Sequence, residues 1–145
     1  MQASQTLDHP HRLIARAAAV VGLLGISLIH LLDLQSKLDE TPYLGVAYLV
    51  LIAAALVTAA LLVHADDRRA WASATVLALL TILGYVVNRS VGMPSATDDI
   101  GNWLEPLGLA SLFVEAITAA ICIYGLVESR SSSTGGDRQR SFQTG

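Results

Sequence analysis

Four long apolar runs, separated by short polar segments, dominate the pattern of this chain. They cover about residues 13–34, 43–63, 71–89 and 104–127. Each run is continuous rather than alternating and is rich in Ala and Leu, which favours helices over strands. A helix needs about 20 residues to cross the roughly 30 Å of hydrocarbon in a bilayer. The pattern therefore predicts an all-α fold: a four-helix, antiparallel transmembrane bundle.

The composition supports a membrane protein. Hydrophobic residues make up 53% of the 145 residues and charged residues only 14%, against about a quarter in soluble domains. A soluble four-helix bundle would need polar outer faces, which these runs lack. The first run is too long for the apolar core of a signal peptide and is interpreted as a retained span. The single cysteine, Cys122, excludes an intramolecular disulfide.

The basic residues predict the orientation. Seven of the nine Lys and Arg lie at the two termini and in the 64–70 loop, and the other two are Lys37 and Arg89. Because positive residues favour the cytoplasmic side, we expect both termini in the cytoplasm and the loops 35–42 and 88–104 on the extracytoplasmic side of the cell membrane. That outer side holds six acids against these two bases. Residues 12–128 form the predicted membrane domain, flanked by flexible tails at 1–11 and 129–145.

The loop before the fourth run carries helix boundary signals. Gly92 and Pro94 are expected to end the third helix. The segment Asn102–Glu105, "NWLE", fits a capping box, with Pro106 in the first turn of the fourth helix.

Polar side chains of the same loop are candidates for contacts outside the membrane. Trp103 is expected to anchor at the interface between membrane and water. Asp98 and Asp99 are most simply interpreted as solvated charges. Alternatively, these three residues and Glu105 form a docking surface for a protein partner.

Three of the four runs carry one polar stripe each, at helical spacing. Because lipid cannot satisfy polar groups, the stripes are expected to face one another and form a cleft among the first, third and fourth helices, open to the outer side. The first stripe is Ser27, His30 and Asp33; the second is Thr81, Tyr85, Asn88 and Arg89; the third is Ser111, Glu115, Thr118 and Cys122.

Ionisable residues inside a span are functional candidates because they are costly to bury. Glu115 is predicted close to the midplane and His30 about one turn below the outer end of the first helix. The structural interpretation of Glu115 is a neutral acid bonded to Ser111, and that of His30 is a neutral imidazole joining two helices. The functional interpretation is a proton, cation or ligand site. Arg89 is expected to pair with Asp33 at the rim, or to hold an anionic group.

The same residues limit which metals or cofactors this chain could hold. One histidine and two carboxylates suit a first-row divalent ion, but ideal helix rise places His30 and Glu115 about 8 Å apart in depth. They are therefore weak metal candidates, and the sequence identifies no cofactor. It holds no phosphate loop, nucleophile elbow or paired-histidine zinc motif, and nothing in it supports nucleic-acid binding.

The segment "GYVVNRSVGMPSATDDIGNWLEPLGLASLFVEA", residues 84–116, resembles a pattern in small, uncharacterised four-span membrane proteins of high-GC Gram-positive (actinobacterial) bacteria. Those proteins show G-Y-x-x-S-R-x-x-G-L-P, an acidic stretch, then G-x-x-S-L-x-x-E, with I-H-L in the first span. Asn88 stands where Ser is common, and Met93 where Leu is common. The resemblance implies a fold and a membrane location, but no activity. It highlights His30, Arg89 and Glu115.

These patterns lead to three hypotheses. The first is a non-enzymatic membrane protein whose outward cleft binds a small ligand or cation through His30, Asp33, Tyr85, Arg89 and Glu115. The second is an accessory or assembly subunit that docks a larger membrane protein, or a second copy, through the 88–104 loop. The third is an enzyme acting on a lipid or quinone, which the sequence favours least.

Overall fold

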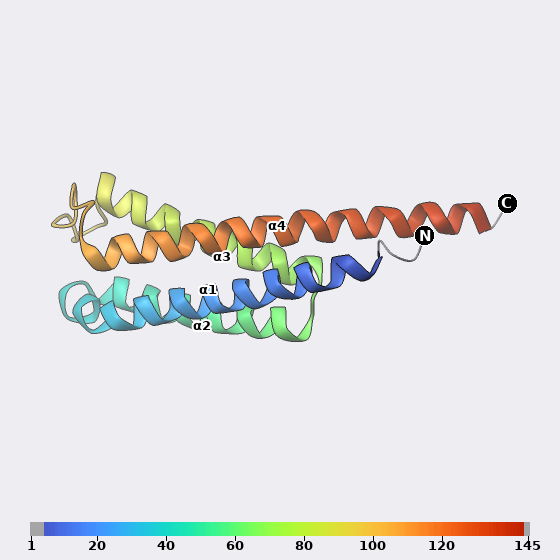
Figure 1. The fold of residues 1–145 in the computed structure, drawn as a ribbon. Helices are drawn as coiled ribbons and strands as arrows, with labels where there is room; N and C mark the ends of the chain where they lie inside the picture. The colour runs from blue at the N-terminus through green and yellow to red at the C-terminus, as the bar shows by residue number, and fades with distance from the viewer. Residues whose placement is uncertain (1–4, 144–145) are drawn as a thin grey trace.

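The computed structural model describes the backbone of residues 5–143 and the side chains of residues 10–129. Four helices fill that range: α1 Gln5–Glu40, α2 Pro42–His64, α3 Arg68–Ser90 and α4 Pro106–Gln143 (Figure 1). All four contain a segment long and apolar enough to cross a membrane. No strand occurs within 5–143, where only an isolated bridge joins Met93 and Ala96. The prediction of an all-α fold with four candidate spans is confirmed.

The first helix ends later than the sequence suggested. The residues expected to form a loop at 35–42 belong almost entirely to α1, and Thr41 alone separates α1 from α2. Side-chain pairs four residues apart stabilise this polar end, with Gln35 donating to Asp39 at 3.0 Å and Ser36 to Glu40 at 2.9 Å. The helix stops because Pro42, at the first position of α2, cannot continue α1.

The start of α1 and the end of α4 also extend beyond the predicted spans. α1 begins at Gln5 and α4 runs to Gln143, so these helices enter the segments expected to be flexible tails, 1–11 and 129–145. Residues 1–4 and 144–145 of those tails lie outside the described residues, and the flexibility of the tails stays a prediction. Adding residues to a helix that already exists avoids the cost of nucleation, so polar, Ser-rich sequence can continue it. The segments suited to the bilayer remain shorter, at Pro10–Glu40 and Pro106–Ser129.

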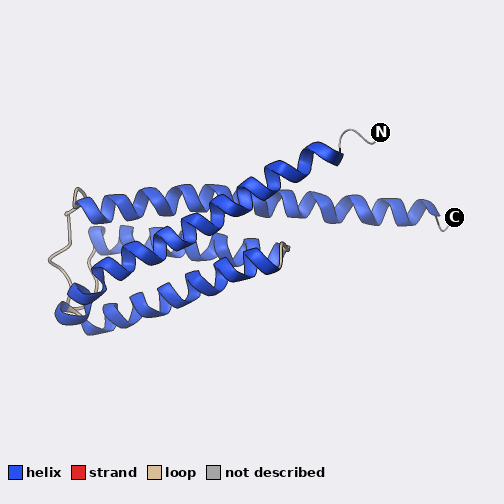
Figure 2. Cartoon of the chain, turned by 60° about the horizontal axis from the view of Figure 1, so that its bottom comes forward, coloured by secondary structure: helices blue, strands red, loops and turns tan. Residues whose placement is uncertain are grey.

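The helices pack unevenly around the bundle. α1 lies against both α2 and α4, α3 packs on α4, and α2 and α3 touch little. Small residues allow the close approach of α1 and α4: a Cβ added at Gly22 would collide with Thr118, and one at Gly25 would lie 3.1 Å from Val114. Figures 1 and 2 show α2 and α3 joined by a short connection at one end and diverging toward the other.

The larger of the two clusters of buried hydrophobic residues in the described range extends to the α2–α3 connection. Trp71 is fully buried there, in a cluster that includes Leu23, Leu62 and Cys122. Asp66, in the connection, accepts hydrogen bonds from Trp71 Nε1 at 2.7 Å and from Arg12 Nε at 2.9 Å. This carboxylate therefore ties α1 to the start of α3.

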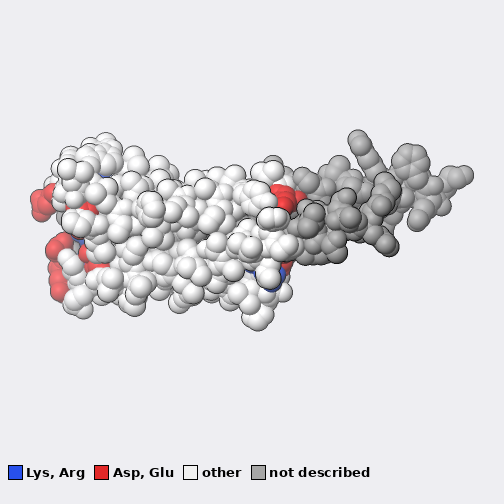
Figure 3. All heavy atoms as spheres, in the orientation of Figure 1, with Lys and Arg blue, Asp and Glu red and all other residues white. Residues whose placement is uncertain are grey.

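At the opposite end, the segment 91–105 forms a folded loop. Gly92, Ser95 and Gly101 adopt positive φ, and Gly101 N donates to Arg89 O at 2.8 Å. Tyr43 of α2 donates its hydroxyl to Pro94 O at 2.6 Å, which holds the loop over the bundle. Figure 3 shows acidic side chains gathered at this end, while the middle of the face shown carries no charged side chain.

The predicted capping box at Asn102–Glu105 is wrong in its register. α4 begins at Pro106, so Glu105 precedes the first helical residue. Its carboxylate accepts from Leu107 N at 2.9 Å and Gly108 N at 2.5 Å. Glu105 thus caps the helix itself, and Asn102 belongs to the loop.

Candidate functional site

A cavity of about 730 Å³ occupies the end of the bundle that carries the loop. Side chains from all four helices and from the loop line it. The prediction placed the cleft among the first, third and fourth helices only, whereas α2 contributes Tyr48, Leu51 and Ala54. The reason is that α2 packs mainly against α1 and touches α3 little, so part of its surface faces the cavity.

The inner part of the cavity holds a histidine and a glutamate side by side. His30 Nε2 lies 4.0 Å from Glu115 Oε1, and Ser111 donates to the same oxygen at 2.7 Å. The predicted 8 Å difference in depth is wrong. His30 lies ten residues before the end of α1 and Glu115 nine residues after the start of α4, which is about 15 and 14 Å at 1.5 Å per residue. The two depths are similar because α1 continues to Glu40, which places His30 further from the end of its helix than the sequence suggested.

Glu115 has an oxygen without a described partner. The residue is 1% exposed, and no donor among residues 10–129 lies within hydrogen-bonding distance of Oε2. Buried carboxylate oxygens are rarely left unsatisfied, so each exception calls for a water, an ion or a ligand. Glu115 lines the cavity, which supplies the space for such a group.

The geometry of His30 constrains its proton. Nδ1 lies 2.9 Å from the carbonyl oxygen of Ile26, which can only accept, so Nδ1 carries the hydrogen. Nε2 then faces Glu115 either as a lone pair or, in the charged form, as a second donor. At 4.0 Å the two side chains are too far apart to share a proton directly, but a donor bound between them can contact both.

Tyr48 and Asp33 complete the wall beside the histidine. The rings of Tyr48 and His30 meet edge to face, with centroids 4.7 Å apart, and Tyr48 OH is 3.4 Å from Asp33 Oδ2. Tyr48 was not among the predicted site residues. It is one of few polar residues in the otherwise aliphatic α2, with Tyr43 and Thr58, and the sequence does contain this signal.

At the mouth of the cavity, Asp99 gathers three donors. Arg89 forms an ion pair with its carboxylate, Lys37 Nζ lies 3.3 Å away, and Asn88 donates at 3.0 Å. The predicted pairing of Arg89 with Asp33 is wrong, because the loop folds Asp99 back over Arg89. Burial raises the pKa of Asp99, but the hydrogen bonds from Asn88 and Arg89 and the charge of Lys37 outweigh it and hold that pKa below its usual value.

The structure separates the other loop candidates. Asp99 is not a solvated charge, whereas its neighbour Asp98 is exposed as predicted. Tyr85 lies under the Arg89 guanidinium, 5.4 Å from ring centroid to Cζ, and donates to Trp103 O at 3.1 Å. Glu105 Oε2 lies 3.5 Å from Arg89 Nη2. Arg89 is therefore held on several sides and is 6% exposed.

The charges around the cavity favour a cation. The lining includes six acids, Asp33, Glu40, Asp98, Asp99, Glu105 and Glu115, and two bases, Lys37 and Arg89. Both bases already pair with Asp99. In the described range, no three His, Cys, Asp or Glu side chains group closely enough to hold a metal ion. The acidic lining and the unpartnered oxygen of Glu115 suit a ligand that donates hydrogen bonds.

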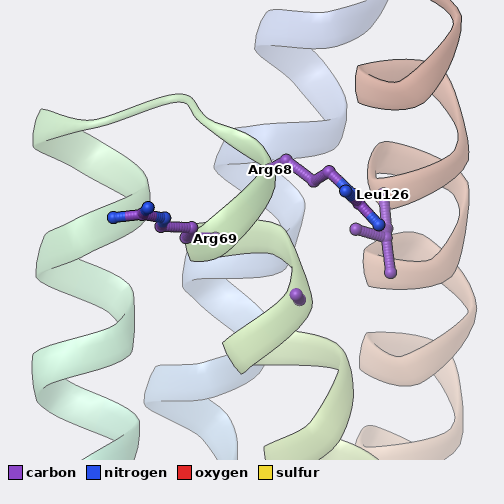
Figure 4. A pocket seen from close by; sticks show the side chains of 4 residues that line it. Arg68, Arg69 and Leu126 are labelled. Carbon is purple, nitrogen blue, oxygen red and sulfur yellow. The ribbon is translucent and has the colours of Figure 1, made fainter.

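A smaller hollow of about 280 Å³ lies at the other end of the bundle, lined by Arg68, Arg69, Ala72 and Leu126. Figure 4 shows Arg68 reaching toward Leu126 of α4 and Arg69 pointing the other way, toward α2. The two arginines therefore do not converge on one point, and the hollow is a weaker candidate than the large cavity.

The fold and site define a small all-helical protein with four candidate membrane spans and an acidic cavity at one end. No family model matches the chain, and no curated protein or solved structure gives a significant match. The resemblance of residues 84–116 to small actinobacterial membrane proteins stays a prediction, and a function has to be argued from the cavity itself.

Proposed function

We propose that this protein is a multi-pass protein of the cell membrane that binds a small cationic or hydrogen-bond-donating ligand in the cavity beneath the 91–105 loop. Glu115 and His30 receive the ligand's donor group, with Tyr48 and Asp33 beside them. Arg89 and Asp99 form the mouth. The observation that carries this proposal is the unpartnered Oε2 of Glu115, a buried residue that lines the cavity.

The proposed orientation puts both termini in the cytoplasm and the mouth of the cavity on the extracytoplasmic side. The distribution of Lys and Arg supports it. A reporter fused after Gly145 is expected to be active only in the cytoplasm. An external signal from that fusion would reverse the assignment.

The ligand proposal is tested on the full chain in mild detergent with butylammonium chloride as the probe. Native mass spectrometry is expected to show one bound amine, and the probe is expected to raise the melting temperature. Both effects should disappear in Glu115→Gln and weaken in His30→Ala. The exposed acid Asp39, outside the cavity lining, provides the matched control, because Asp39→Asn should bind as the unaltered chain does. Equal binding by Glu115→Gln and Asp39→Asn would refute the site.

A second function, docking of a larger membrane protein or a second copy, is favoured by the apolar rim of the loop. Leu104 is 82% exposed, and Val91 and Ile100 are exposed beside it. A partner that co-purifies in stoichiometric amount and is lost in Leu104→Ser would support this role. Retention of that partner by Leu104→Ser would exclude the rim as its docking surface.

A further inference from the structure

The cavity also reaches the side of the bundle, between α2 and α3. Its lining there is apolar and consists of Val50, Leu51 and Ala54 from α2 with Leu77 and Leu80 from α3. Val50 is 64% exposed and Leu80 is 57% exposed, although both line the cavity. Side chains that are exposed and also line a cavity stand at the edge of an opening. This lateral opening lies between α2 and α3, two helices that touch little.

The opening lies at the depth of hydrocarbon. Val50 is eight residues from the start of α2 and Leu80 ten residues from the end of α3, which places them about 12 and 15 Å from those helix ends. Both helices are apolar enough to span a membrane. In a bilayer of roughly 30 Å hydrocarbon thickness, this side of the cavity would face lipid tails rather than water.

Gly84 marks free space in the same wall. It lines the cavity, and a Cβ built on it would meet nothing within 4 Å. This contrasts with Gly22 and Gly125, where a Cβ would collide with Thr118 and with Trp71. Gly84 is therefore not required for helix packing. A side chain added at this position starts in open space rather than in the packed core.

The lateral opening and the polar site lie at similar depth. His30 and Glu115 are about 15 and 14 Å from the ends of α1 and α4 that face the loop. A molecule that enters from the side meets an apolar wall first and then the residue Glu115, which also lines the cavity and has one unpartnered oxygen. The excess of six acids over two bases in the lining favours a positive head. The volume lies within the range of about 300–1,000 Å³ for small-molecule sites.

We infer that the cavity accepts a single-chain amphiphile with a primary ammonium head, which enters from the bilayer between α2 and α3. The ammonium group donates to Glu115 Oε2, and the hydrocarbon chain lies along Val50, Leu77 and Leu80. This inference rests on the proposed function and adds to it the ligand class and the access route.

The test uses the full chain in phosphatidylcholine nanodiscs, with dodecylamine carrying a photoreactive diazirine in its chain as the probe. After irradiation, intact mass gives the labelled fraction and peptide mapping gives the position. We expect labelling on α2 and α3 around Val50 and Leu80. Unlabelled dodecylamine should compete at least tenfold more effectively than butylamine, and dodecyl sulfate, with the same chain and an anionic head, should not compete.

Two variants separate the head site from the access route. Glu115→Gln removes a charge-assisted hydrogen bond and should reduce specific labelling roughly tenfold. Gly84→Leu fills the lateral opening and should reduce labelling by dodecylamine while butylammonium still raises the melting temperature. Ala53→Leu adds the same side chain to the exposed surface of α2, outside the cavity lining, and should label normally.

The outcomes distinguish this inference from the proposed function. Binding of butylammonium with no labelling of α2 and α3, or unchanged labelling of Gly84→Leu, overturns lateral access and leaves the proposed function in place. Equal competition by dodecyl sulfate shows that the chain alone adsorbs and overturns the ammonium assignment. Failure of both amines to bind refutes both proposals. The competition between dodecylamine and dodecyl sulfate needs no variant, so it tests the ammonium assignment even if Glu115→Gln does not fold.

Discussion

Replacing Asp99 by Asn should destabilise the mouth of the cavity more than any other single change in the loop. Asp99 is the acceptor for Arg89, Lys37 and Asn88 at once. Arg89 is buried, and without Asp99 its nearest carboxylate is Glu105, 3.5 Å away and at the edge of the site. Asp99→Asn therefore leaves a buried guanidinium with a poorer partner and removes the charge opposite Lys37.

The magnitude follows from the burial of the two partners. Removing one member of a fully buried ion pair costs about 3–5 kcal/mol. The side chain of Asp99 is 21% exposed, and Glu105 retains part of the interaction, so we expect about 1.5–3 kcal/mol, the range for hydrogen bonds to charged groups. Asp98→Asn, next to it but exposed, should change the free energy of unfolding by less than about 0.5 kcal/mol.

A double-mutant cycle gives the decisive assay, with unfolding in mild detergent followed by circular dichroism. Arg89→Gln and Asp99→Asn should be coupled by about 1–2 kcal/mol, whereas Arg89→Gln and Asp33→Asn should add within about 0.5 kcal/mol. Additivity of the first pair, or strong coupling of the second, would refute the assignment of Asp99 as the partner of Arg89.

Three further predictions concern the rest of the bundle. Gly84→Ala should raise the free energy of unfolding by about 0.5–1 kcal/mol, since it replaces a helical glycine in open space. Gly125→Ala should lower the free energy of unfolding, because the added Cβ meets Trp71. Denaturant unfolding of both variants checks that the two changes have opposite signs. Trp71→Phe should cost about 1–3 kcal/mol because Asp66 loses a donor, while the same change at the loop tryptophan should cost little in the same assay. The pKa values of Asp66 and Asp99 are both lowered: burial raises them, but hydrogen bonds from Trp71 and Arg12 to Asp66, and those described above to Asp99, outweigh it. The stability that these two carboxylates contribute is therefore complete above their unfolded pKa of 3.8 and is lost as the pH falls below 3.8 through their folded pKa values. Thermal melts between pH 6 and 3 should show this loss as a lower melting temperature. Melting temperatures unaffected by that acidification would contradict both assignments.

Sequence reasoning succeeded where a single physical rule decides the structure. The four apolar runs predicted the helices because a bilayer-length run of Ala and Leu has few alternatives. The rule that polar stripes turn inward brought His30, Arg89 and Glu115 to one cavity. It did not reveal that α2 would open away from α3, because that depends on packing between helices rather than on the pattern within one.

Its errors came from equating the end of an apolar run with the end of a helix. The first run loses its hydrophobicity after Leu34, yet α1 continues to Glu40 through side-chain pairs that need no lipid. This shift moved His30 to the depth of Glu115. The partner of Arg89 could not be predicted for a different reason. Asp33 and Asp99 were both available on the same side, and the fold of the loop decides between them.

The packed core and the acidic cavity lie at different ends of the bundle, which explains how so small a protein can hold such a cavity. The end near the α2–α3 connection holds Trp71, which packs against Gly125 and donates a hydrogen bond to Asp66. The opposite end holds the cavity and is closed by ion pairs and the loop. Because the tight packing and the cavity occupy different levels, substitutions such as Gly84→Leu can alter the opening at little cost to the core. The same separation lets α2 and α3 diverge while their short connection remains fixed.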